Sequence, residues 1–211
     1  MAKLKAPLMS LGASGALGKA LVFFGWKGLN VVREYVVPAN PDTQLQQDHR
    51  KILKAGVAKV HVAQARELNP LDRDDQIAYA ALAAAKGKIM TWFNQALKLW
   101  IDVKVAGDLP VIYSNGCMMK TTATDFRPLI HQNEETLEDL KAGKFYLGIS
   151  KTNLITSKEA VVGLGQHCTL LVDGGFSSLT VGKKYYWQFR PDSTDDCVGA
   201  DSGIYHAKAT A

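Results

Sequence analysis

Histidine and cysteine side chains can bind a metal ion or act in nucleophilic catalysis, and this 211-residue chain contains five histidines and three cysteines. The five histidines (His49, His61, His131, His167 and His206) follow neither an HxxxH nor an HExxH spacing, so the pattern does not favour a metal site. Cys168 follows His167, but neighbours in a strand point to opposite faces, so we expect Cys168 to be a core residue. The three cysteines, Cys117, Cys168 and Cys197, include no CxxC pair and cannot all pair with one another, which favours a reducing compartment and no structural zinc.

Two acidic clusters are the next candidates for chemistry. The four aspartates of residues 192–201 lack the spacing and the closing glutamate of an EF-hand, so we expect hydrated side chains and not a calcium site. The acidic stretch 134–141 is typical of the solvated face of a short helix. The sequence therefore predicts no catalytic residue, no bound metal and no cofactor, and we expect that the protein is not an enzyme.

A glycine motif near the N-terminus, Gly12, Gly15 and Gly18, resembles the phosphate loop of short-chain dehydrogenases. That fold needs a buried strand before the loop and a crossover helix after it. Residues 3–10 instead contain two lysines and a proline, and six residues separate Gly18 from Gly25. We therefore interpret these glycines as turn residues.

Charge is distributed unevenly along the chain. Residues 1–105 contain 15 Lys+Arg and 8 Asp+Glu (net +7), whereas residues 106–211 contain 10 and 12 (net −2), which sums to +5. No apolar run approaches the ~18 residues of a membrane span, and the glycines of residues 10–18 interrupt any signal-peptide core. The pattern predicts no membrane partner and at least two regions with different roles.

The first 41 residues form the first of three predicted segments, a basic, glycine-rich arm. Apolar residues favour two strands, 20–24 and 30–37, joined by a turn at residues 25–28 into a β-hairpin. Prolines at positions 38 and 41 end the second strand.

Residues 42–101 are predicted to form an antiparallel hairpin of two helices. Helical spacing of apolar residues predicts the first over 43–67, where Gly56 weakens the helix by about 1 kcal/mol relative to alanine. Asp72 is a favourable N-cap for the second, which we expect to continue through Ile89 to Trp100.

Residues 102–211 contain short apolar runs separated by turn residues, which favours an antiparallel β-sandwich. We expect strands at Val103–Val105, Val111–Tyr113, Phe145–Ser150, Ala160–Leu164, Cys168–Val172, Lys184–Phe189 and Gly203–Ala209, with a turn at Ser114–Gly116. The predicted fold class is therefore α+β.

One stretch of this region resembles fibronectin type III domains, in which a leucine precedes a tyrosine by six positions. Leu179 and Tyr185 have that spacing, although Val181 stands where the family usually has proline. Tyr185, Trp187 and Phe189 alternate along the strand, so they share one face, which we expect to lie in the sandwich core together with Leu179.

A longer match covers residues 12–50, which resemble a family of small proteins of tailed bacteriophages and prophages. Its outline is a Ser-Gly-x-x-Gly turn, a hydrophobic strand, a basic turn, Val-Arg, Pro-x-Asn-Pro-x-Thr, Gln and Arg. Here these fall at Ser14, Gly15 and Gly18, at Lys27-Gly28, at Val32-Arg33, at Pro38–Thr43, and at Gln47 and Arg50. Family members continue with two helices and often with a β-rich domain.

The resemblance implies a virion structural protein of the capsid surface, head–tail junction or tail, made in the cytoplasm of a bacterial host. A basic arm is suited to ordering on a partner, so we expect assembly in multiple copies and with other virion proteins. The expected assembly residues are Gly12, Gly15, Gly18, Trp26, Lys27, Arg33 and Arg50. Two alternatives are a sandwich that binds a host-surface glycan and, less favoured by the modest charge, a nucleic-acid-binding protein.

Overall fold

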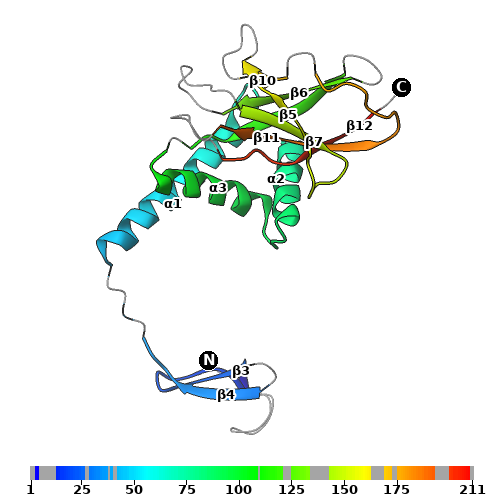
Figure 1. Ribbon diagram of the computed structural model, residues 1–211. Coiled ribbons are helices and arrows are strands. Elements are labelled where there is room, and N and C mark those ends of the chain that lie inside the picture. The colour runs from blue at the N-terminus through cyan, green and yellow to red at the C-terminus, as the bar shows by residue number, and fades with distance from the viewer. Residues whose placement is uncertain are drawn as a thin grey trace. The chain divides into compact units, whose positions relative to one another are not determined.

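The computed structural model describes residues 3–4, 13–26, 29–37, 39, 42–108, 110–120, 125–133, 143–162, 169–172, 175–192 and 200–209. Within these residues the fold is α+β, with three helices and antiparallel sheets (Figure 1). The chain divides into two compact units, residues 1–44 and 45–211, so the helices and the later strands belong to one unit. The finer division at residues 41 and 101 stays a prediction. Among the described residues, none of the helices has the length and apolarity needed to cross a membrane.

The first unit contains a sheet of four antiparallel strands in the order β1-β2-β3-β4, which we name the arm sheet. Its strands are β1 (Lys3–Leu4), β2 (Ala13–Leu17), β3 (Leu21–Trp26) and β4 (Leu29–Glu34). The predicted hairpin is present as β3 and β4, whose register places Trp26 opposite Leu29. Gly18 has a φ of +60° between β2 and β3, a backbone conformation that glycine adopts without strain.

The helices of the second unit are α1 (Gln44–Ala65), α2 (Arg73–Ala85) and α3 (Trp92–Ala106). The prediction of one helix from Asp72 to Trp100 is wrong, because the chain leaves the helix after Ala85. Gly87 has a φ of +67° there, and the Thr91 hydroxyl caps the start of α3 by accepting a hydrogen bond from the Asn94 N–H. The strand expected at Val103–Val105 is also wrong, because these residues continue α3 up to its left-handed cap at Gly107.

Two four-stranded sheets follow, in the orders β5-β6-β10-β9 and β12-β11-β7-β8. The first contains β5 (Tyr113–Lys120), β6 (Phe126–Gln132), β10 (Thr169–Leu171) and β9 (Val161–Val162). The second contains β12 (Tyr205–Lys208), β11 (Lys184–Pro191), β7 (Gly143–Gly148) and β8 (Thr156–Glu159). All of the pairings among these described strands are antiparallel, as expected for a sandwich.

Two local features of the first sheet differ from the sequence-based expectation. Ser114–Gly116 is not a turn between strands but a bulge within β5, where the register with β6 shifts and Asn115 has a φ of +48°. Strand β6 was not predicted, and it contains Pro128, a residue type that is rare in a strand interior. Pro128 is accommodated because β10 pairs with β6 only from Leu129 onward.

One hydrophobic core lies between the two sheets. It includes Tyr113 and Ile130 from one sheet and Phe145, Trp187 and Phe189 from the other. The Tyr113 and Phe189 rings meet edge to face with centroids 5.2 Å apart, which links the two layers. The fibronectin type III likeness of this sandwich stays a prediction.

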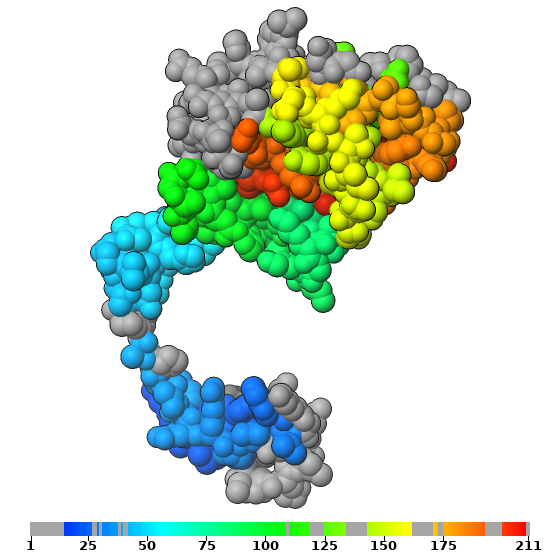
Figure 2. Space-filling view, viewed as in Figure 1, coloured from blue at the N-terminus to red at the C-terminus, as the bar shows by residue number. Residues whose placement is uncertain are grey.

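A second core lies among the helices and joins Val60 of α1, Tyr79 of α2 and Trp100 of α3. In the space-filling view the green helices lie directly against the red C-terminal strand (Figure 2). Helix α2 therefore connects the helical core with the sandwich.

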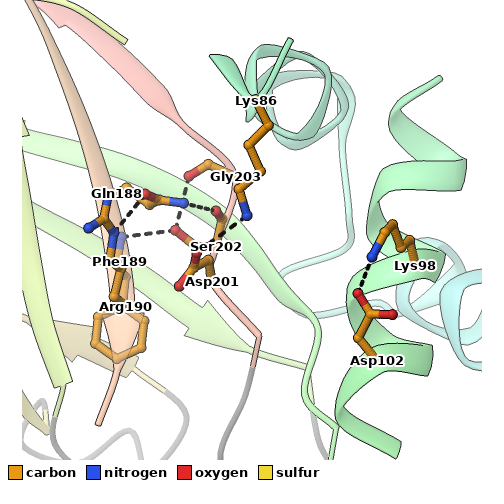
Figure 3. Close-up of polar contacts among 9 residues, drawn as sticks. All are labelled: Lys86, Lys98, Asp102, Gln188, Phe189, Arg190, Asp201, Ser202 and Gly203. Carbon is orange, nitrogen blue, oxygen red and sulfur yellow. Dashed lines mark hydrogen bonds and ion pairs between the residues drawn. The ribbon is translucent and has the colours of Figure 1, made fainter. Parts of the chain in front are cut away.

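The segment that precedes β12 fastens α2 to the sheet (Figure 3). The Ser202 hydroxyl accepts a hydrogen bond from the Phe189 N–H at 2.9 Å, and the Gln188 side chain donates to the Ser202 carbonyl at 2.9 Å. On the helix side, the Ile204 N–H donates to the Ala78 carbonyl at 2.9 Å, and Lys86 pairs with Asp201 at 3.7 Å. Gly203 allows this close approach, because a Cβ there would lie 2.7 Å from the Cβ of Ala78.

Candidate functional site

Two regions qualify as candidate sites: the exposed arm sheet of the first unit, and a pocket beside a buried carboxylate in the second. The arm sheet has apolar side chains on both faces. Opposite residues of antiparallel strands share a face, so Leu21 and Phe23 lie on one face with Val32 of β4. Phe24 and Trp26 lie on the other face with Leu29 and Arg33.

This sheet buries little of its own apolar surface. Among the residues whose burial is described in the first unit, only Phe23 is buried. Trp26 is 58% exposed, Leu29 68% and Val37 73%. The other exposed large apolar residues of this unit are Leu17, Leu21, Val32, Tyr35 and Val36. Apolar exposure on this scale in one short stretch is typical of an interaction surface.

Strand β4 forms one edge of the arm sheet, and the exposed segment Tyr35–Val37 continues it. An edge strand presents unpaired backbone N–H and C=O groups, which can pair with a strand of another chain. Strand β4 also carries the positive charge of Arg33. The Arg33 guanidinium lies 5.4 Å from the centroid of the Phe24 ring. The combination of an open backbone edge and apolar faces suits strand addition or face-to-face packing.

The predicted assembly residues fall in different places. Gly15, Gly18, Trp26 and Arg33 all lie in the arm sheet or its turns. Arg50 lies in α1, which belongs to the second unit except for its first residue, so the structure does not place Arg50 in the sheet. Gly12 and Lys27 lie outside the described residues.

Asp75 on α2 is a fully buried carboxylate. It forms a reciprocal capping box with Asp72: the Asp72 side chain accepts from the Asp75 N–H at 3.0 Å, and the Asp75 side chain accepts from the Asp72 N–H at 3.1 Å. The same carboxylate reaches the bulge of β5, where it accepts from the Asn115 N–H at 2.9 Å and the Gly116 N–H at 3.2 Å. A fourth bond comes from the Tyr205 hydroxyl of β12 at 2.7 Å.

Burial and these four hydrogen bonds act in opposite directions on the pKa of Asp75. Each carboxylate oxygen accepts two bonds, so all four lone pairs are used and a proton would displace one donor. Burial raises the pKa of Asp75, and the four hydrogen bonds oppose that rise. The four donors therefore favour the carboxylate form of Asp75, while burial, the larger effect, keeps its pKa above the ordinary value.

Two tyrosines complete this buried site. The Tyr79 hydroxyl donates to the Tyr113 carbonyl at 3.0 Å, and burial, followed by the charge of Asp75, raises the pKa of Tyr79. The same two causes raise the pKa of Tyr205, so both hydroxyls keep their protons. The Tyr205 ring lies against the backbone of Gly116, where a Cβ would come within 2.2 Å of it.

A polar network beside Asp75 fixes the link between α1 and α2 to the first sheet. The Asn69 side chain accepts from Asn115 at 2.8 Å through its oxygen, so its nitrogen faces the Nδ1 atom of His131 at 3.2 Å and donates to it. The Asn69 carbonyl accepts from the Ser114 hydroxyl at 2.8 Å. Asn69 has a φ of +52°, so the chain turns sharply here after α1.

A pocket of about 320 Å³ lies beside this site, which we name the α2 pocket. Its walls come from α2, from β5 and from the β11–β12 pair, and the hydroxyl of the lining Tyr205 donates to Asp75. The lining residues are Asp74, Ile77, Ala78, Gly116, Cys117, Met118, Trp187, Ile204, Tyr205, His206 and Ala207.

The other histidines, cysteines and acidic residues considered from the sequence lie partly within and partly outside the described residues. His49 and His61 lie on the exposed surface of α1, and the His61 ring lies 5.7 Å from that of Phe93. Among the described residues, no three His, Cys, Asp or Glu side chains are grouped closely enough to hold a metal ion. His167, Cys168, Asp195, Asp196, Cys197 and residues 134–141 lie outside the described residues. Leu179, Tyr185, Trp187 and Phe189 are all buried in the sandwich core.

In the sequence, Asp75 is recognisable only as an acidic residue in the first turn of the helix that Asp72 caps. A signal for one half of its role was present, because Asp72 and Asp75 have the spacing of a capping box. Its contacts with Asn115, Gly116 and Tyr205 join residues 40 to 130 positions apart, which no local pattern could reveal.

Comparisons with protein-family models, with curated proteins and with solved structures found no match.

Proposed function

We propose that this chain is a non-enzymatic structural protein of a tailed-bacteriophage particle and that it assembles in multiple copies through the arm sheet. The observation that carries the proposal is the exposure of apolar side chains on both faces of that sheet. The sequence resemblance over residues 12–50 supplies the biological setting.

The energetics of a small sheet support assembly. The first unit spans 44 residues, and at ~40 residues a chain usually needs a staple or a partner to be stable. Full burial of an exposed leucine or valine contributes about 1.5–3 kcal/mol, so covering Leu29, Val36 and Val37 would add several kcal/mol. Packing against a partner surface would therefore add stability to the arm sheet beyond what the burial of Phe23 provides.

The open edge of β4 indicates how neighbouring copies would pair. A strand of a neighbouring subunit can pair with the backbone of β4, and its side chains then extend both apolar faces. The net charge of residues 1–44 is +3, from five Lys+Arg and two Asp+Glu, which favours a partner surface with acidic residues at its rim.

Deletion of residues 1–37 tests the proposal in particles. We expect the shortened protein to stay soluble and helical, because the helices and the sandwich form their own compact unit. We also expect it to be missing from purified particles, measured by mass spectrometry of virions made with the full-length or the shortened gene. Incorporation of the shortened protein at the normal level would reject the arm as the assembly element. Absence of the full-length protein from particles would reject the virion role itself.

A further inference from the structure

Backbone hydrogen bonding in the arm sheet determines which groups face its open edge. The Tyr35 N–H donates to the Ala20 carbonyl at 2.8 Å, one position beyond the end of β4. In an antiparallel pair, successive residues direct their N–H and C=O groups alternately toward and away from the neighbouring strand. Odd-numbered residues of β4 therefore bond to β3, and the backbone groups of Asn30, Val32 and Glu34 point to the open edge.

The β4 edge can pair with the same edge of a second copy. A twofold axis perpendicular to the sheet makes the two strands antiparallel, and outward-pointing residues then lie opposite outward-pointing residues. With Val32 on this axis, all of residues 29–35 lie opposite the same residues of the second copy. The pairs Asn30–Glu34, Val32–Val32 and Glu34–Asn30 would each form two backbone hydrogen bonds, about six in total. The strand at the other edge, β1, spans only Lys3–Leu4 as described and offers much less backbone.

The neighbouring registers are less favourable. A pairing centred on Arg33 would place the two Arg33 side chains directly opposite each other, and one centred on Glu34 would do the same with two carboxylates. Like charges directly opposite each other destabilise a sheet. A pairing centred on Val31 would leave Tyr35 beyond the start of β4 in the second copy, which lies at Leu29. The register centred on Val32 avoids all three defects.

In this register exposed apolar side chains meet across the axis. Val32 lies opposite its own copy, and Leu29 lies opposite Tyr35 on both sides of the axis. These side chains are 42%, 68% and 38% exposed in the single chain, so the pairing would remove apolar surface from water. The Arg33 guanidinium lies 5.4 Å from the centroid of the Phe24 ring of β3, and is thus directed away from the axis.

We propose that the partner of the arm sheet is a second copy of this chain, and that the two β4 strands pair antiparallel about a twofold axis at Val32. This inference names the partner in the proposed assembly through the arm sheet and rests on that proposal. The pairing joins two four-stranded arm sheets into one continuous sheet. Because a contact of this kind closes on itself, a dimer is the unit from which larger assemblies are built.

Disulfide trapping tests the register. In a full chain whose three native cysteines are replaced by serine, Val32→Cys should give covalent dimers on mild oxidation. Opposed hydrogen-bonded residues have Cα atoms about 5.5 Å apart, within the range of disulfides. Val31→Cys should react about fivefold more slowly or less, because its copies would be more than ~7 Å apart. Leu21→Cys is the control: it lies on the same face as Val32 but in β3, with a similar exposure of 38%, and should not react above background.

A proline substitution tests the backbone contact. The Val32 N–H points away from β3, so Val32→Pro should remove an edge donor and leave the β3–β4 ladder in place, as edge strands tolerate. Sedimentation velocity should show self-association about tenfold weaker, or more, than that of Val32→Thr, which keeps the N–H.

Salt distinguishes a second copy of the arm sheet from an acidic partner surface. Each first unit has a net charge of +3, so the two units repel each other and their pairing should tighten as salt screens the charge. Self-association that weakens as salt rises would overturn the β4 pairing in favour of an acidic surface elsewhere on the chain.

The remaining outcomes separate this pairing from assembly itself. Suppose that the full chain forms oligomers, but Val32→Cys is trapped no faster than Leu21→Cys or Val31→Cys, or Val32→Pro associates as tightly as Val32→Thr. Either result would overturn the β4 pairing and leave assembly through the arm sheet in place. A full chain that stays monomeric at every concentration would overturn both the assembly and the pairing.

Discussion

Single residues of the second unit fix how distant segments meet. Asp75 joins the start of α2 to the bulge of β5 and to Tyr205 of β12 by four hydrogen bonds. The sequence indicated the helix start, because Asp72 is a favourable N-cap, and the structure confirms that cap. It could not indicate the bulge, because Ser114-Asn115-Gly116 has turn chemistry and is held within a strand by contacts with the distant residues Asn69 and Asp75.

Replacing Asp75 with asparagine should destabilise the fold. An amide nitrogen cannot accept hydrogen bonds, so the substitution leaves two of the four donors unsatisfied, at about 1–3 kcal/mol each. We expect urea denaturation to show a loss of about 3 kcal/mol or more in the free energy of unfolding. The exposed Asp102→Asn variant should lose at most about 0.5 kcal/mol. A loss below about 1 kcal/mol for Asp75→Asn would contradict the role assigned to this carboxylate.

His131 should make stability depend on pH. Burial lowers its pKa below the ordinary value of 6.5, so the unfolded chain takes up a proton at a higher pH than the folded chain does. The free energy of unfolding should therefore fall as the pH drops through 6.5 towards the folded pKa, by at most about 1.4 kcal/mol per pH unit for this group.

Denaturation at pH 7.5 and pH 5.5 measures this effect. His131→Gln should reduce the difference between the two pH values, because glutamine can accept the Asn69 bond and does not titrate. Part of the difference should remain, since the lowered pKa of His206 acts with the same sign. An undiminished pH difference in the variant would show that His131 is not the group responsible.

At the level of elements, helical periodicity located α1 to within two residues at each end but missed the break between α2 and α3. The first helix was predicted over 43–67 and occurs over Gln44–Ala65. The second was predicted as continuous because apolar residues recur up to Trp100. The break depends on Gly87 and on the Thr91 cap, and it leaves Ile89 fully exposed instead of on the apolar stripe.

Gly56 gives a sharp test of packing against helix propensity. Propensity alone predicts that Gly56→Ala stabilises α1 by about 1 kcal/mol. The structure predicts the opposite, because a Cβ at Gly56 would lie 2.7 Å from Leu97 Cδ1 and 2.8 Å from Trp100 Cε3. Overpacking of this kind costs about 1–3 kcal/mol, so we expect net destabilisation of about 1 kcal/mol in urea denaturation.

A double-mutant cycle isolates the contact behind that expectation. The cost of Gly56→Ala should shrink in a Leu97→Ala background, where the nearest clashing atom is absent. A stabilised single variant would show that the separation of α1 and α3 adjusts without cost.

At the level of the whole molecule, the sequence established the order of the parts better than their pairing. A strand-rich arm, helices and an antiparallel sandwich follow one another as predicted. The strand orders β5-β6-β10-β9 and β12-β11-β7-β8 could not be derived, because the pairs β6–β10 and β7–β11 join distant segments and β6 contains Pro128, which argues against a strand interior. The exposed character of the arm was foreseeable, since its apolar residues follow one another without alternation and leave neither face polar.

Sedimentation velocity of the full chain is the most direct test of assembly through the arm sheet. We predict oligomers whose fraction rises with concentration, and we predict that Trp26→Ser/Leu29→Ser shifts the protein to the monomer. These two residues lie opposite each other on one face and are 58% and 68% exposed. The control Leu68→Ser/Ile89→Ser alters residues that are 81% and 108% exposed outside the sheet, and it should assemble like the unaltered chain. A full chain that stays monomeric at all concentrations, or an arm-sheet variant that assembles as the control does, would contradict the account.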